Sequence, residues 1–210
     1  HYKINVVGVD GIQCSYCCIS SQIITTFITS KHIMVSTILI SIAGFFALII
    51  IIGIFIPSKY RFIRTTTIDA DRRKVFNTID DLTTWKEWSA WSKNKDPKIE
   101  ITYGEKTSGY GASMQWKGGT MGKGEITITQ TEPYQTININ AIFNKGVFKM
   151  EFTFIIEAVN DKSVDVSWVV TGKTKRGGFA KLLGRFLPKM MGRDMETALK
   201  ILKHYSEGTL

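Results

Sequence analysis

Apolar side chains recur every three or four residues from Phe179 to Tyr205, the last long segment of the chain. The residues between them are mainly lysine, arginine and glutamate. This spacing predicts a helix with one buried face. Pro188 removes a backbone donor within the pattern, so we expect a kink or a break there. The apolar positions of the stripe are Leu183, Phe186, Leu187, Met190, Met191, Met195, Ala198, Leu199, Leu202 and Tyr205.

From Ile99 to Val170 apolar and polar residues alternate instead, and turn residues separate the alternating segments. The clearest segments run from Phe148 to Ile156 and from Val164 to Val170. A period of two predicts strands of an antiparallel sheet that buries one face. A sheet and a helix that are each apolar on one side can bury these sides together. The sequence therefore predicts an α+β fold, in which a curved antiparallel sheet wraps around one long C-terminal helix.

The segment before this sheet region predicts a first strand and two short helices. Tyr60 to Asp69 is rich in threonine and isoleucine, which favour strands. Asp69 is placed to cap the first helix, and Trp85 and Trp88 belong to the second. Together with Trp91, these tryptophans are expected to close one end of the sheet. A pocket mouth and a contact with the membrane interface are the alternatives.

Several short motifs accompany this order of elements: Val75-Phe76-Asn77, Asp80-Asp81-Leu82, the W-x-x-W-S-x-W run from Trp85 to Trp91, Asp96-Pro97, the turn from Gly104 to Gly111, and Gly122-Lys123-Gly124. With them, residues 60–210 resemble the helix-grip fold of the START-like SRPBCC superfamily, in particular the bacterial proteins grouped as polyketide cyclase/dehydrase and lipid-transport related. This resemblance implies a hydrophobic cavity between the sheet and the C-terminal helix. It implies no reaction, because the superfamily spans carriers, sensors and enzymes.

Residues 35–56 carry no charge, and their only polar side chains are serine and threonine. At about 1.5 Å per residue, such a helix can cross a hydrocarbon layer of about 30 Å. A cleaved signal peptide fits poorly, because no basic segment follows Met34 and no A-x-A-like site precedes Pro57. We expect a single membrane anchor. Residues 1–33 are then either translated upstream sequence, if the protein starts at Met34, or an N-terminal tail.

The charge distribution sets expectations for the location and partners of the domain. Lys59, Arg61 and Arg64 follow the apolar run, so the positive-inside rule places the domain in the cytoplasm. The formal net charge is +9, yet lysine and arginine are scattered among acidic residues, without the dense basic run of a nucleic-acid binder. The expected partners are a hydrophobic small molecule or lipid and an anionic membrane surface, and not nucleic acid.

The predicted apolar face offers few groups for catalysis. Acidic residues fall on the opposite face of the clear strands, and His204 lies near the helix end, where a solvated or helix-terminal role is expected. Cys14 and Cys17 form a C-x-x-C motif that lacks a second pair, so we expect neither a metal site nor a cofactor. Tyr103 and Tyr110 are the hydrogen-bond donors expected inside a cavity.

These patterns predict a membrane-anchored module that binds a lipid-like or polycyclic molecule between sheet and helix. Two alternatives remain: a cyclase- or dehydratase-like enzyme that uses Tyr103 or Tyr110 as a donor, and a structural or regulatory domain without a ligand. The sequence does not distinguish a cavity from a filled core, because a difference of one methylene group in side-chain volume already changes how a core packs. The expected ligand-contacting residues are Tyr103, Tyr110, Met114, Trp116, Ile126, Ile128, Phe148, Met150, Phe152, Trp168, Val170, Leu183, Phe186, Met190, Met191 and Met195.

Overall fold

The computed structural model of the chain describes residues 33–52, 55, 58–146, 148–173 and 178–209, without the side chains of residues 145 and 178–185. The chain divides into two compact units, His1–Ile51 and Ile52–Leu210. A helix, Ile33–Ile52, of which all but the last residue belongs to the first unit, is long and apolar enough to cross a membrane. The hydroxyls of Ser36 and Thr37 donate to the carbonyl of Ile33 at 2.9 and 2.8 Å, so these polar groups are satisfied within the helix.

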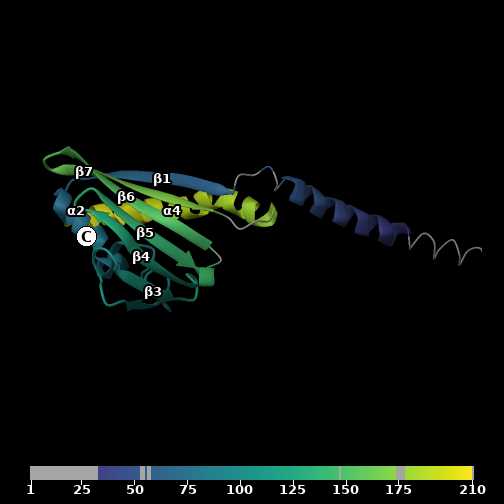
Figure 1. Cartoon of the computed structure of the whole chain (residues 1–210), viewed down its shortest axis with the longest axis horizontal. Helices are drawn as coiled ribbons and strands as arrows, with labels where there is room; N and C mark the ends of the chain where they lie inside the picture. The colour runs from purple at the N-terminus through teal and green to yellow at the C-terminus, as the bar shows by residue number, and fades with distance from the viewer. Residues whose placement is uncertain (1–32, 53–54, 56–57, 147, 174–177, 210) are drawn as a thin grey trace, which may run out of the picture. The chain divides into compact units, whose positions relative to one another are not determined.

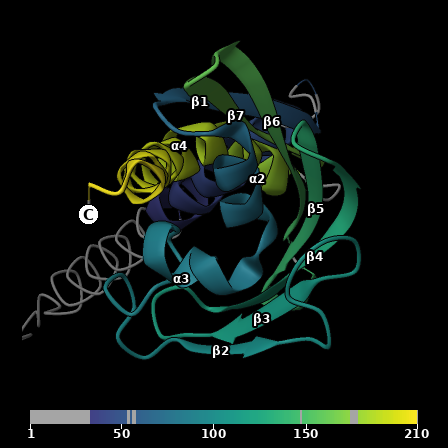
Figure 2. The same cartoon turned by 90° about the vertical axis from the view of Figure 1, so that its left-hand side faces the viewer.

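The second unit is built on one seven-stranded antiparallel sheet, in the order β1-β7-β6-β5-β4-β3-β2. Register shifts follow Ile128 in β4 and Ala158 in β6, and such bulges bend a sheet. The sheet curves around the helix α4 (Figures 1 and 2). The predicted α+β helix-grip architecture is confirmed. The strands are β1 (Lys59–Ile68), β2 (Glu100–Tyr103), β3 (Ser113–Lys117), β4 (Lys123–Glu132), β5 (Thr136–Phe143), β6 (Phe148–Asn160) and β7 (Ser163–Lys173).

The inner face of the sheet is defined by a row of apolar side chains in register across five strands. Phe62 lies opposite Val170, Val170 opposite Phe152, Phe152 opposite Ile139, and Ile139 opposite Ile128. All five are buried. Because alternate residues of a strand share a face, this row fixes which side chains point into the core. The buried residues of α4 that join the same core are Met195, Ala198, Leu199 and Leu202.

Three short helical segments follow β1: α2 (Arg72–Asp80), the 3-10 helix η1 (Leu82–Thr84) and α3 (Trp85–Trp88). The cap of α2 is Asp71, whose carboxylate accepts hydrogen bonds from the backbone N–H groups of Arg73 and Lys74 at 2.8 and 3.3 Å. The prediction of Asp69 as the cap is wrong, because α2 begins only at Arg72.

The helix α4 (Gly178–Glu207) is continuous through Pro188, so the expectation of a break there is wrong. It is attached to β1 at two levels. Arg64 Nε donates to Glu196 Oε1 at 2.6 Å, and Lys203 Nζ donates to the carbonyl of Thr67 at 2.7 Å. The later residue of β1 pairs with the later residue of α4, so α4 runs along β1 in the same direction. A short 3-10 helix, η2 (Asn144–Gly146), connects β5 to β6.

Candidate ligand-binding site

The structure places most of the predicted ligand-contacting residues on the inner face of the sheet or on the side of α4 that packs against it. Among the partly buried ones, Tyr103, Phe148 and Met191 pack against the core. The side chain of Leu183 lies outside the described residues. The fully or almost fully buried ones are Met114, Trp116, Ile126, Ile128, Met150, Phe152, Trp168, Val170 and Met195.

Tyr110 does not point into the core, and its inward orientation was predicted wrongly. Its side chain is 70% exposed. The flanking residues Gly109 and Gly111 have positive φ angles of 72° and 84°, which glycine adopts readily. They form a turn, and the strand β3 begins only at Ser113. The alternation that extends from Ala112 to Trp116 therefore does not reach back to Tyr110.

Phe186 and Met190 were also predicted to face the sheet, and this is wrong. They are 53% and 65% exposed. The buried line of this part of α4 consists of Leu187, Met191 and Met195, spaced four residues apart. The apolar stripe in the sequence is thus wider than the side of the helix that the sheet covers.

An aromatic cluster lies in the interior between the sheet and the helices. The ring centroids of Trp85 and Trp88 lie 4.9 Å apart, and those of Phe154 and Trp168 lie 4.9 Å apart as well. Trp91 packs on Trp116 at 5.2 Å. These tryptophans are at most 4% exposed, which agrees with the structural role expected for the W-x-x-W-S-x-W run and excludes its contact with a membrane surface.

Two indole N–H groups in this cluster have no hydrogen-bond acceptor among the described residues. They belong to Trp91 and Trp168, which are 4% and 3% exposed. Both rings contact Phe152, at centroid distances of 6.4 and 5.5 Å. By contrast, Trp85 donates to the carbonyl of Ile79 at 2.8 Å. Buried donors are normally paired, so each of these two N–H groups is an unsatisfied polar group in an otherwise apolar interior.

Trp168 was predicted as a ligand-contacting residue, and Trp91 as a residue that closes one end of the sheet, with a pocket mouth as an alternative; neither was predicted as a hydrogen-bond donor. Tyr60 and Phe62 were not among the predicted residues, and their rings stack at 6.2 Å on the inner face of β1. The alternation of Tyr60 and Phe62 with charged residues was a signal that could have revealed them. No pattern in the sequence marks an indole as unpaired, because pairing depends on where the neighbouring carbonyls lie.

Tyr103 lies at the end of β2, opposite Met114, and its side chain is partly buried against the core. Burial raises the pKa of the Tyr103 phenol, and the negative charges of Asp81 and Glu87 raise it further. The phenol therefore stays protonated at neutral pH and can donate a hydrogen bond. A protonated phenol is what the donor role predicted for Tyr103 requires.

The turn between β3 and β4 is held by the carboxylate of Asp96, which is 1% exposed. Its oxygens accept hydrogen bonds from the N–H groups of Thr120 at 2.8 Å, Met121 at 2.9 Å and Lys98 at 3.1 Å. These bonds, led by the one from Met121, lower the pKa of Asp96. The Trp116 indole donates to the carbonyl of Met121 in the same turn at 3.3 Å, so the turn held by Asp96 also contacts Trp116.

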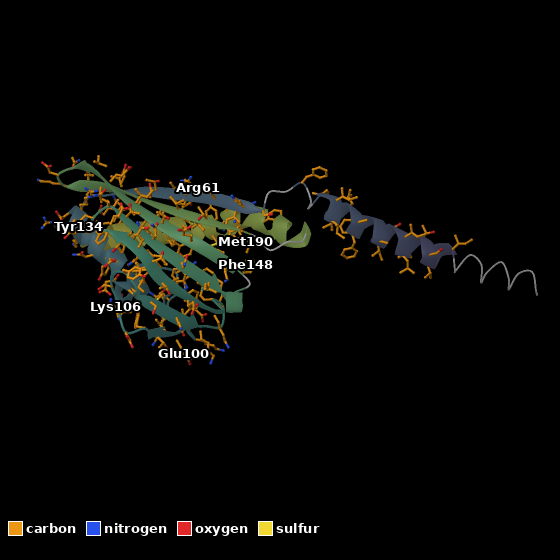
Figure 3. The ribbon with its side chains drawn as sticks, in the orientation of Figure 1. Arg61, Glu100, Lys106, Tyr134, Phe148 and Met190 are labelled. Atoms are coloured by element: carbon orange, nitrogen blue, oxygen red, sulfur yellow. The ribbon has the colours of Figure 1, made fainter. Side chains whose placement is uncertain are left out.

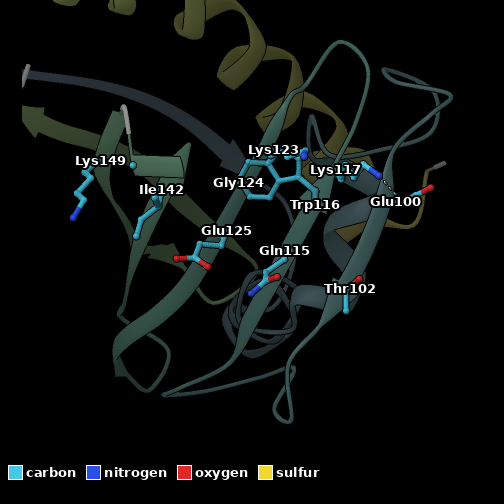
Figure 4. A pocket seen from close by; sticks show the side chains of 11 residues that line it. Glu100, Thr102, Gln115, Trp116, Lys117, Lys123, Gly124, Glu125, Ile142 and Lys149 are labelled. Atoms are coloured by element: carbon cyan, nitrogen blue, oxygen red, sulfur yellow. Dashed lines mark ion pairs between the residues drawn. The ribbon is translucent and has the colours of Figure 1, made fainter. Parts of the chain in front are cut away.

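The outer face of the sheet carries an open hollow of about 910 Å³ over β2 to β6 (Figure 4). Its floor follows one row of register, from Thr102 through Gln115 and Glu125 to Ile142 and Lys149. The rim carries charges of both signs, and Lys117 lies 4.0 Å from Glu100. Such a mixed, open surface is not built to enclose an apolar molecule.

A second hollow, of about 820 Å³, lies at the end of the sheet where β1 begins and β7 finishes. Its lining includes the cations Lys59, Arg61, Lys149 and Lys173, against one carboxylate, Glu151. Among the described residues, no group of three or more His, Cys, Asp or Glu side chains is arranged to hold a metal ion.

The curved sheet around a long helix, with an aromatic interior between them, defines a domain of the helix-grip class. The model of the family "Polyketide cyclase / dehydrase and lipid transport" matches residues 60–207. The chain belongs to this family. A search among curated proteins gives no significant match.

Solved structures share the fold at low sequence identity. The Zhui aromatase/cyclase from a Streptomyces species is 12% identical with a TM-score of 0.53, and the similarity covers 71% of this chain and 94% of that one. Norcoclaurine synthase from Thalictrum is 11% identical with a TM-score of 0.53, covering 70% and 97%. Aha1 from Colwellia psychrerythraea is 15% identical with a TM-score of 0.51, covering 71% and 98%. Proteins with such different names show that the fold does not define the activity.

Proposed function

We propose that the protein is a membrane-anchored binding module for a hydrophobic small molecule, lipid-like or polycyclic, that carries a hydrogen-bond acceptor. The ligand lies between the inner face of the sheet and α4, and the predicted residues that face this interior contact it. Family membership supports a hydrophobic ligand, and the aromatic and methionine side chains of the inner face suit one.

The observation that carries the proposal is the pair of unpaired indole N–H groups of Trp91 and Trp168. Leaving a buried donor unsatisfied costs about 1–3 kcal/mol. A carbonyl, ester or hydroxyl oxygen on the ligand would remove this penalty for the donor it reaches, while the apolar body of the ligand packs against neighbours such as Phe152. A ligand with such an oxygen should therefore bind with a more favourable free energy than a pure hydrocarbon of the same size.

The test is extraction of the purified full chain with organic solvent, followed by mass spectrometry. We expect an apolar molecule with an oxygen acceptor to co-purify, and Trp168→Phe to lower its occupancy roughly tenfold, the equivalent of about 1.4 kcal/mol. Trp88→Phe is the matched control, because the Trp88 indole already donates to Thr84 Oγ1 at 3.2 Å. A chain that is recovered empty and binds neither fluorescent fatty acids nor sterol-like probes would favour a ligand-free interaction domain instead.

The helix Ile33–Ile52 supports the anchoring part of the proposal, since it is long enough to span and its hydroxyls are satisfied internally. Lys59, Arg61 and Arg64 on its C-terminal side favour a cytoplasmic domain. A reporter fused after Leu210 should be active only in the cytoplasm, and activity on the other side alone would overturn this orientation.

A second candidate function is a cyclase- or dehydratase-like enzyme that uses Tyr103 as a hydrogen-bond donor. The protonated, partly buried phenol of Tyr103 favours it. Once a substrate is found, Tyr103→Phe should reduce turnover, whereas Tyr110→Phe should not, because Tyr110 is 70% exposed on a turn. Equal turnover in both variants would remove this candidate.

A further inference from the structure

Two exposed apolar side chains stand together on α4. Phe186 and Met190 are one helical turn apart and are 53% and 65% exposed. Lys189 and Arg193, which are exposed as well, lie beside them on the same helix. Large apolar residues flanked by cations form the pattern of a helix surface that meets an anionic bilayer.

The level of this pair along the domain follows from the two contacts between α4 and β1. Glu196 is paired with Arg64, and Lys203 with Thr67, so seven residues of helix match three of strand. This ratio fits rises of about 1.5 and 3.3 Å per residue. Extending it towards the start of both elements places Met190 level with Arg61 and Phe186 level with Lys59 and Tyr60.

The second hollow, whose lining includes Lys59, Arg61, Lys149 and Lys173, lies at this same end. Lys59 pairs in register with Lys173, and Arg61 with Thr171. Figure 3 shows Arg61, Phe148 and Met190 towards one end of the domain and Tyr134 towards the other. The basal end is defined as the set Lys59–Arg61, Phe148–Met150, Thr171–Lys173 and Phe186–Met190.

The cations of the basal end outnumber the carboxylates around them among the described residues. Lys59, Arg61, Lys149 and Lys173 are exposed, and none of them forms an ion pair with a residue that the structure describes. In contrast, Lys203, near the other end of β1, contacts Glu207 at 3.0 Å and Asp69 at 3.6 Å. The basal end therefore presents net positive charge on the outer face of the sheet, at the level of the exposed apolar side chains of α4.

The covalent chain restricts how far this end can be from a bilayer. Only residues 53–58 separate the helix that ends at Ile52 from the strand that begins at Lys59. At no more than about 3.6 Å per residue, this connection spans at most about 25 Å. If the helix crosses a membrane, the start of β1 stays close to that membrane's surface.

We propose that the basal end docks on the anionic lipid surface of the bilayer that the helix Ile33–Ile52 spans. This inference rests on the proposed membrane anchor. Phe186 and Met190 enter the interfacial region, and the cations of the hollow contact the lipid phosphates. The docked face holds the β1 end of the interior beside the lipid, from which a hydrophobic ligand would have to arrive.

The experiment uses the full chain in nanodiscs, with Cys14, Cys17 and Cys18 replaced by serine and one environment-sensitive fluorophore attached at Met190→Cys. The matched control carries the fluorophore at Val159→Cys, which is 54% exposed near the opposite end of β6. Nanodiscs contain phosphatidylcholine alone, or with roughly 30% phosphatidylglycerol, which supplies the anionic surface. Emission is compared at low salt and at about 1 M salt, where the screening length falls to about 3 Å.

We expect a blue shift of the probe at position 190 in anionic nanodiscs, its reversal at high salt, and no shift at position 159. Changing Lys59, Arg61, Lys149 and Lys173 together to glutamine should abolish the shift, whereas Lys74→Gln with Lys162→Gln should leave it. A chain that inserts but keeps position 190 in water, or shifts both probes equally, overturns the docking surface alone. A chain that does not enter nanodiscs overturns the anchor and the docking surface together, and leaves ligand binding standing.

Discussion

The guanidinium of Arg64 lies directly on the backbone of Gly192. A Cβ added at Gly192 would be 3.1 Å from Arg64 Cζ and would overlap the nitrogen Nη2. Arg64 reaches across α4 at this point to pair with Glu196. The glycine in the middle of the helix therefore has a packing reason: it makes room for the residue that attaches β1 to α4.

This contact predicts a non-additive pair of substitutions. In a helix, Gly→Ala normally stabilises by about 1 kcal/mol. Gly192→Ala alone should change the free energy of unfolding by less than about 0.5 kcal/mol, because it displaces Arg64 and loses an exposed ion pair of comparable worth. In an Arg64→Ala background, the same change should stabilise by about 1 kcal/mol. Urea unfolding of the four chains in detergent checks this, and equal effects in both backgrounds would contradict it.

A second prediction concerns Gly124 in the Gly122-Lys123-Gly124 motif. A Cβ at Gly124 would overlap the ring of Trp116 and lie 2.7 Å from the carbonyl oxygen of Ile142. Gly124→Ala should destabilise the domain by about 1–3 kcal/mol, as expected for overpacking against a buried ring and backbone. Gly119→Ala is the control, since its nearest new neighbour would be at 3.6 Å, an ordinary contact. Similar unfolding midpoints for the two variants would refute the steric account.

Acid stability should depend on Asp96. Its pKa is lowered in the folded state by the N–H groups of Met121, Lys98 and Thr120. A lowered pKa gives stability that is present above the unfolded value of about 3.9 and is lost as pH falls through the folded pKa. Asp96→Asn should therefore lower stability at neutral pH and flatten the decline below about pH 4. Unfolding curves across this range, with the exposed-turn variant Asp161→Asn as control, measure the difference.

Alkaline stability should depend on Tyr60. Burial raises the pKa of Tyr60 to about 12. The unfolded phenol ionises near pH 10, so between about 10 and 12 the unfolded state loses a proton that the folded state keeps, and stability falls as pH rises. Tyr60→Phe should reduce this loss, and Tyr110→Phe, on an exposed turn, is the control variant. Unfolding midpoints near pH 9 and near pH 11 provide the measurement, and an unchanged alkaline decline in Tyr60→Phe would contradict the prediction.

The sequence by itself determined the architecture of this protein. The alternation around Phe152 and Trp168 identified strands and their buried face, and the spacing of Leu187, Met191 and Met195 identified the helix that covers it. These features could be predicted because periodicity reflects local geometry, which any chain of the same pattern must satisfy.

Only the tertiary structure decided which members of each pattern meet the interior. The positive φ angles at Gly109 and Gly111 turn Tyr110 outward, and the width of the sheet leaves Phe186 and Met190 uncovered. The free indole N–H groups of Trp91 and Trp168 became visible only in three dimensions as well. Exposure and hydrogen-bond pairing depend on the positions of residues distant in sequence, and neither a period of two nor a period of 3.6 contains that information.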